Sequence, residues 1–96
     1  MARIVHATAA DADLEEIWSY IADDNVRAAD KLLERIAATF DLLAVTPDLG
    51  FNCDQIRPGV RCKPVTRNYL VFYRVTGNDV IILRVLHSAR KPDNLL

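Results

Sequence analysis

The chain has 96 residues, of which 51% are hydrophobic and 26% are charged, a composition that argues against disorder and predicts one globular domain over residues 1–96. The net charge of −1 conceals an asymmetry, because residues 1–50 hold 4 Lys and Arg against 10 Asp and Glu, whereas residues 51–96 hold 8 against 3. The basic second half indicates an anionic partner.

The amino-terminal residues predict a short strand followed by a helix. Residues 3–7 are apolar at their centre, and Thr8 is placed to cap a helix that ends near Asp24. Acidic side chains in the first turns favour this helix through its dipole. One apolar stripe runs along it, formed by Leu14, Ile17, Trp18 and Ile21. We therefore expect Trp18 in the core, and Tyr20, which lies off the stripe, to face a partner.

A second helix is predicted immediately after the first. Asn25 is placed as its N-cap, and apolar positions repeat with helical period from residue 26 to about residue 46. The short break between the helices predicts an antiparallel helical hairpin. Pro47 and Gly50 then end the helix and open a loop.

The basic half is predicted to form strands. Residues 59–65 give the first, which Pro64 confines to an edge or a bulge, and residues 68–75 give a central strand. Gly77 and Asn78 suit a two-residue hairpin turn into a partner strand over residues 80–87. The predicted fold class is α+β, in the order β-α-α-β-β-β, with the helical hairpin packed on one face of a mainly antiparallel, four-stranded sheet.

Strict alternation along the last strand separates two faces. Ile81, Leu83, Val85 and His87 share one face, and Val80, Ile82, Arg84 and Leu86 share the other. If the helices cover one face, the solvated face is expected to gather a cationic floor, with His87, Arg90 and Lys91 at its rim; the floor itself comprises Arg61, Lys63, Arg74 and Arg84. The alternative is that these cations are simply solvated or paired with carboxylates of the acidic half.

Localisation and cofactors follow from what the sequence lacks. No apolar run is long enough to cross a bilayer, and the start, MARIVHATAADADLEE, lacks the apolar middle region of a secretion signal, so we expect a cytoplasmic protein. Cys53 and Cys62 are too few for a zinc cage and are expected to be buried thiols. No glycine-rich phosphate loop is present, and neither a cofactor nor a metal is expected.

Several segments, taken in order, resemble a known family. The chain resembles the RelE/ParE superfamily of toxins from type II toxin-antitoxin modules in six segments: DLEEIWSYIADDN, AAD, LAVTPDLG, RPGVR, YLVFYRV and VIILRVLHSAR. The ending RVLHSAR is most similar to the ParE branch. The resemblance implies a toxin that harms its own cell until a cognate antitoxin neutralises it. The antitoxin would do so by laying an apolar and acidic segment over the helical hairpin and sheet. Candidate antitoxin-binding residues are Tyr20, Arg61, Lys63 and Arg74.

The resemblance leaves two toxic activities open. A ParE-like toxin is not an enzyme but binds DNA gyrase, traps its cleaved-DNA state and blocks replication; candidate target-binding residues are Arg84, His87, Arg90 and Lys91. A RelE-like toxin cuts mRNA in the ribosomal A site, which needs a base, an acid and cations that stabilise the charged phosphorane. The candidate catalytic residues would then be Arg61, Arg84, His87 and Asp54.

Two departures from the nuclease pattern favour gyrase inhibition. No aromatic residue follows His87, and Lys63 lacks the second lysine that one nuclease subgroup uses. A third reading remains beside these two, in which the chain forms a stable complex and toxicity has been lost.

Overall fold

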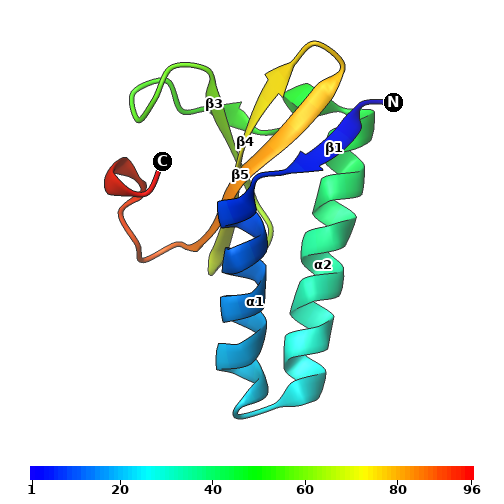
Figure 1. The fold of residues 1–96 in the computed structure, drawn as a ribbon, viewed down its shortest axis with the longest axis vertical. Helices are drawn as coiled ribbons and strands as arrows, with labels where there is room; N and C mark the ends of the chain where they lie inside the picture. Colours follow the sequence, from blue (N-terminus) through cyan, green and yellow to red (C-terminus); the bar gives the residue numbers. More distant parts are fainter.

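A helical hairpin packs on one face of a five-stranded sheet, which confirms the predicted fold class (Figure 1). The structure, a computed structural model, describes the backbone of residues 1–96 and every side chain except that of Asp93. The helices are α1 (Thr8–Ala22) and α2 (Val26–Val45). The strands, in the spatial order β1-β5-β4-β3-β2, are β1 (Arg3–His6), β2 (Phe51–Asn52), β3 (Val60–Pro64), β4 (Tyr69–Thr76) and β5 (Asp79–His87). No helix in the described part of the chain is long and apolar enough to span a bilayer.

Only β1 runs parallel to its neighbour, β5, and all other pairs are antiparallel. The expectation of four strands was wrong, because β2 pairs with β3 at Arg61 and Cys62 and so adds a fifth strand at its edge. A two-residue strand is too short to show a period of two, so the sequence gave no signal for it. Pro64, the last residue of β3, lies beyond the end of β2, where no neighbour needs its missing N–H.

The helix starts differ in how they are capped. Ala7, not Thr8, is the N-cap of α1, and it supplies no side-chain bond, so the predicted Thr8 cap was wrong. Thr8 is drawn into the first turn because Ala10 and Asp11 both donate their backbone N–H to the carbonyl of Ala7. At α2 the prediction is confirmed: the Asn25 side chain accepts from the N–H of Ala28 at 3.0 Å.

A β-bulge in β5 overturns the predicted alternation. Phe72 lies opposite Arg84 and Tyr73 lies opposite Ile82, so Leu83 has no partner on β4. The extra residue inverts the phase of the strand, so that Ile82 and Val85 both enter the core under the helices while Arg84 faces the other way. The hairpin turn itself is as predicted: Gly77 has a φ of +58° and Asn78 does not enter the left-handed region, as in a type II′ turn.

Both faces of the sheet are covered, contrary to the expectation of one solvated face. The first core lies between sheet and helices and is formed by Ala10, Ile36, Phe40, Leu43, Val71, Tyr73, Val80, Ile82 and Val85. The second core lies on the opposite face, where Leu95 and Leu96 of the C-terminal segment and Ile56 of the loop before β3 pack against Cys53, Val60, Cys62, Phe72 and Leu86. The two cysteines are free and buried, as predicted, and burial raises the pKa of Cys62 to about 12.

Tyr73 fixes the segment that joins α2 to β2. Its side chain is fully buried; its hydroxyl donates to the carbonyl of Pro47 at 2.7 Å and accepts from the N–H of Gly50 at 2.8 Å. A Cβ on Gly50 would lie 2.7 Å from this hydroxyl and 2.7 Å from the carbonyl oxygen of Cys62, closer than van der Waals contact allows. The phenol of Tyr73 thus helps to hold the short 3-10 turn Pro47–Leu49 against the sheet, and its close approach requires glycine at position 50.

Candidate functional site

The predicted cationic floor does not form. In the β3–β4 register Val60 lies opposite Arg74 and Arg61 lies opposite Tyr73, so Arg61 and Arg74 point to opposite faces of the sheet. Lys63 shares the helix-side face with Arg61, whereas Arg84, shifted by the bulge, shares the far face with Arg74. The prediction was wrong because it needed the register between strands, which alternation within each strand does not supply.

Arg84 forms a buried ion pair with Asp13 of α1. Its Nε and one terminal nitrogen donate to the two carboxylate oxygens at 2.7 Å each, and its other terminal nitrogen donates to the carbonyl of Leu95 at 2.8 Å. The Asp13 and Arg84 side chains are only 7% and 18% exposed, and the hydrogen bonding of the guanidinium to the Asp13 carboxylate raises the pKa of Arg84. The backbone N–H of Val85 also donates to Asp13, at 3.0 Å, where β5 has run past the end of β1. The guanidinium therefore ties together α1, β5 and the C-terminal segment.

Arg61 and Asp54 also hold backbone segments in place. One terminal nitrogen of Arg61 donates to the carbonyls of Asp48 and Gly50, at 3.0 and 2.5 Å, and its buried Nε has no partner among the described residues. Asp54 accepts from the N–H of Gly59 at 2.9 Å and from the Asn52 amide at 3.0 Å, and these two bonds lower its pKa. Asp54 thus closes the loop before β3.

The structure brings three of the predicted residues together in one pocket. Tyr20, His87 and Arg90 line a cavity of about 340 Å³ between α1 and the end of β5, together with Asp13, Glu16, Ile17, Tyr69, Val85 and Leu86. We call this the Tyr–His pocket. The imidazole of His87 lies edge-on to the ring of Tyr69, with centroids 5.2 Å apart and planes at 78°. His87 Nδ1 accepts from the N–H of Ala89 at 3.0 Å, so in the neutral ring the proton is on Nε2.

Sequence reasoning missed Tyr69 and Glu16 as members of this pocket. Counted back from the Gly77–Asn78 turn without a bulge, the residue opposite Tyr69 would be Leu86; with the bulge it is His87. The Tyr69–His87 contact therefore depends on the extra residue. Burial raises the pKa of the Tyr69 hydroxyl, and the pocket offers it as a neutral donor. Lys91 is exposed at the start of the C-terminal segment, outside this pocket.

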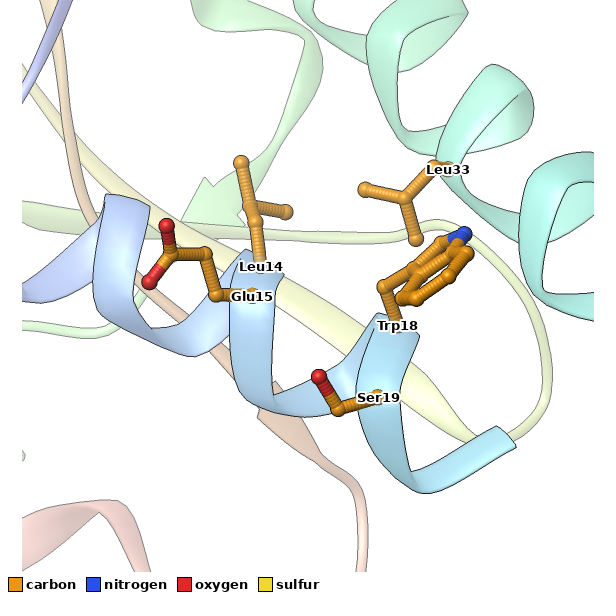
Figure 2. A pocket seen from close by; sticks show the side chains of 5 residues that line it. All are labelled: Leu14, Glu15, Trp18, Ser19 and Leu33. Atoms are coloured by element: carbon orange, nitrogen blue, oxygen red, sulfur yellow. The ribbon is translucent and has the colours of Figure 1, made fainter. Parts of the chain in front are cut away.

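A second hollow follows the seam between the helices. Figure 2 shows Leu14 and Trp18 of α1 facing Leu33 of α2, with Glu15 and Ser19 on the α1 side, and the hollow measures about 460 Å³. Trp18 is 37% exposed and donates its indole N–H to Asp30 at 2.8 Å, so the prediction of a core residue was wrong. The Trp18 ring of α1 therefore spans to α2, where the Asp30 carboxylate accepts its hydrogen bond.

This hollow continues toward the sheet. A further cavity of about 290 Å³ shares Leu14 and Leu33 and is also lined by Ile4, His6, Ile36, Ala37, Phe40 and Asp41. His6 closes its far end, with Nδ1 2.8 Å from a carboxylate oxygen of Asp11 and its ring edge-on to Phe40 at 5.2 Å. We call the two cavities together the helix groove. Its lining is mainly apolar and includes the carboxylates of Glu15 and Asp41. Two further carboxylates, of Asp30 and Asp11, bond to Trp18 and His6 of the lining.

Comparison with known proteins places this fold and sequence in one family. The family model described as "ParE toxin of type II toxin-antitoxin system, parDE" matches residues 4–92. Toxin ParE1 of Mycobacterium tuberculosis is 40% identical over 96 residues, covering 98% of this chain and 97% of that protein. Toxin ParE3 of Caulobacter vibrioides is 34% identical over 87 residues, covering 90% and 86%.

Solved structures agree with this assignment. The chromosomal ParDE toxin-antitoxin system from P. aeruginosa contains a chain that superposes with a TM-score of 0.77 at 26% identity, covering 91% of this chain and 96% of that one. The YoeB/ParE toxin from Agrobacterium tumefaciens shares the fold, with a TM-score of 0.64 at 17% identity and coverage of 88% and 96%. The resemblance seen in the sequence is thereby confirmed, and the chain belongs to the ParE family of toxins of type II toxin-antitoxin systems.

Proposed function

We propose that this ParE-family toxin inhibits DNA gyrase without cleaving RNA, and that a cognate antitoxin neutralises it in the cytoplasm. The observation that carries the choice of activity is the separation of the candidate nuclease residues. Arg61 lies opposite Tyr73 of β4, and His87 lies opposite Tyr69 of the same strand. Since these two partners are separated by four residues at ~3.3 Å each, Arg61 and His87 are about 13 Å apart in the direction of β4. Two groups acting on one phosphodiester need to reach the same few atoms.

The other two nuclease candidates are already engaged. All the polar groups of Arg84 point to Asp13 or to the Leu95 carbonyl, and Asp54 is bonded within its own loop. Of the four, His87 lines the Tyr–His pocket, whereas Arg84 lines a separate pocket on the far face of the sheet, so the two do not open onto the same space. A general acid–base pair flanked by free cations, which the RNA-cleaving reaction requires, is therefore not assembled in this conformation.

For gyrase we propose that the contact surface is the Tyr–His pocket with the adjoining exposed turn. His87, Arg90 and Lys91 provide polar and cationic groups there, and Tyr20, 78% exposed, provides an apolar ring. Arg84 was expected to touch the target directly. Its geometry instead supports a positioning role, because it fixes the strand end and the C-terminal segment on either side of that surface.

An assay with the purified full chain tests this activity. Gyrase supercoiling should be inhibited and cleaved DNA should accumulate, while mRNA on translating ribosomes stays intact. The Arg90→Ala, Lys91→Ala double variant should weaken gyrase inhibition by at least tenfold, and Arg27→Ala, a cation removed from the far end of the hairpin, should leave it unchanged. Ribosome-dependent mRNA cuts with unaffected gyrase would establish the nuclease instead, and unimpaired growth on induction would mean that toxicity has been lost.

For the antitoxin we propose the helix groove and the neighbouring Tyr20 as the main docking surface. The groove is long, apolar and formed by two helices, which suits an amphipathic helix of a partner. Because the rim of the groove carries carboxylates, the antitoxin segment that lies in the groove should be apolar with Lys or Arg at its flanks. The acidic antitoxin segment expected from the sequence would then bind on the far side of the molecule. Of the other predicted antitoxin contacts, Arg61 and Lys63 donate to nearby carbonyls, whereas Arg74 lies on the far face.

The Trp18→Ala variant tests the groove. Removing a half-exposed indole from the centre of an interface should weaken antitoxin binding by about 2–4 kcal/mol, or about 30- to 900-fold. Leu42→Ala is the matched control, because Leu42 is an exposed apolar residue of α2 outside the groove. Isothermal titration of each variant with the antitoxin measures the effect. Equal affinities for Trp18→Ala and the unchanged chain would move the docking surface elsewhere.

A further inference from the structure

A second cationic site lies on the sheet face that the helices do not cover. Three arginines from three different segments line a pocket of about 250 Å³: Arg57 in the loop before β3, Arg74 on β4 and Arg84 on β5. Its walls are the side chains of Leu83, Leu95 and Leu96. In Figure 1 the C-terminal segment turns back toward the loop before β3, and the pocket lies where these two meet the sheet. We call it the arginine pocket.

Two of its three guanidinium groups have no counter-ion among the side chains that the structure describes. Arg84 has its carboxylate, Asp13, and its bond to Leu95. Arg57 and Arg74 form no ion pair with any side chain that the structure describes. Two positive charges with apolar walls and no described counter-ion attract an anion more strongly than two solvated surface charges, because the low-polarity walls weaken screening.

The backbone that carries Arg57 is fixed, and Arg74 lies beside it. The loop that bears Arg57 is closed by the Asp54–Gly59 bond and by bonds from the N–H groups of Ile56 and Arg57 to the carbonyl of Cys53, at 2.9 and 3.2 Å. Gly59, at a φ of +83°, leaves room for Arg74, whose Nε would lie 3.8 Å from a Cβ built on that glycine. The guanidinium of Arg74 is therefore beside the loop that carries Arg57.

The shape of the pocket favours a side chain over a nucleic acid. A guanidinium pair binds carboxylate and phosphate oxygens in the same forked geometry. A DNA duplex presents its phosphates on a stiff rod and binds proteins through some 6–10 of them, whereas this recess offers two free cations on a chain with a net charge of −1. A Glu or Asp side chain reaches into a recess, and apolar neighbours in its sequence can pack on the three leucines.

We propose that the arginine pocket binds the carboxylate of an acidic residue in an apolar-flanked segment of a partner protein. The proposal rests on the proposed function only in that a toxin of this family acts through a protein partner. It adds a site on the face of the sheet opposite the helix groove, so that a partner segment using both sites passes around the edge of the domain. Neither the gyrase assay nor the Trp18 variant reports on it.

Side-chain NMR of the ¹⁵N-labelled full chain tests the proposal with defined probes. The peptides are acetyl-Leu-Glu-Leu-amide and its Gln counterpart, and inorganic phosphate and a 12-base-pair duplex serve as competing anions. We expect the Glu peptide to shift the Nε–H resonances of Arg57 and Arg74, and the Gln peptide to bind at least tenfold more weakly. The Arg57→Gln, Arg74→Gln double variant should lose at least tenfold in affinity for the Glu peptide.

The controls separate this site from general electrostatics. The double variant Arg27→Gln, Arg67→Gln removes the same charge from exposed positions outside the pocket and should bind the Glu peptide as the unchanged chain does. The single variant Arg57→Gln changes only an exposed loop side chain and should also bind the Glu peptide more weakly. It therefore tests the site even if the Arg74 substitution disturbs the sheet. The proposal would be overturned if the Gln peptide caused equal shifts, or if the control variant lost as much affinity for the Glu peptide. It would also be overturned if phosphate or DNA, but not the Glu peptide, shifted Arg57 and Arg74.

Discussion

Replacing Asp13 by Ala is expected to lower the free energy of unfolding by about 3–5 kcal/mol, the loss usual when one partner of a buried ion pair is removed. The Asp13 carboxylate receives three hydrogen bonds, two from Arg84 and one from the N–H of Val85. Its removal leaves a guanidinium that is 18% exposed without its counter-ion and a buried N–H without an acceptor. Urea unfolding followed by circular dichroism measures the loss.

Glu15→Ala provides the matched control for Asp13. Glu15 is an exposed carboxylate of the same helix, and its removal should change the stability by no more than about 0.5 kcal/mol. A similar loss in both variants would mean that helix α1, not the ion pair, is responsible. The result also bears on toxicity, because an Arg84→Ala variant that loses activity must first be shown to remain folded before Arg84 is credited with a direct contact.

The Tyr73→Phe variant is expected to lower the free energy of unfolding by about 2–6 kcal/mol, because one buried and one partly buried backbone group lose their partner at about 1–3 kcal/mol each. The N–H of Gly50 loses its acceptor and the carbonyl of Pro47 loses its donor, while the shape of the core is unchanged. Thermal unfolding compared with Tyr20→Phe, whose side chain is 78% exposed, isolates the buried hydroxyl. A Tyr73→Phe chain as stable as the Tyr20→Phe chain would show that water replaces the phenol at this site.

The helical hairpin and the last turn were predictable because their signals are local. Asn25 as a cap and Gly77–Asn78 as a turn act on their immediate neighbours in the chain, and both were found as predicted. The Leu83 bulge has no such signal, since the three residues before it are apolar and suit a strand on either face. The predicted alternation along β5 therefore failed, whereas the cationic floor failed because Arg61 and Arg74 point to opposite faces of the sheet.

The candidate site was only partly predictable for the same reason. His87 and Arg90 stand out in the sequence as polar groups closing an apolar strand, and they do line one pocket. Asp13 could not be matched to Arg84 from the sequence, because the pair joins the second turn of α1 to the end of β5 across 71 positions. The arginine pocket depends on how the C-terminal segment returns to the sheet, and no periodic pattern in that segment indicates its path.

The unpaired Leu83 divides β5 into two parts that can change independently. The pairing of β5 with β1 stops at Ile82, one residue before Leu83. The part of β5 that carries His87 begins after Leu83. A deletion of Leu83 would leave each remaining partner on β4 in place, whereas a deletion of Val85, two residues further along, would reverse the direction of every later side chain. The strand thus contains one position at which the chain length can vary, while the part beside β1 keeps its register.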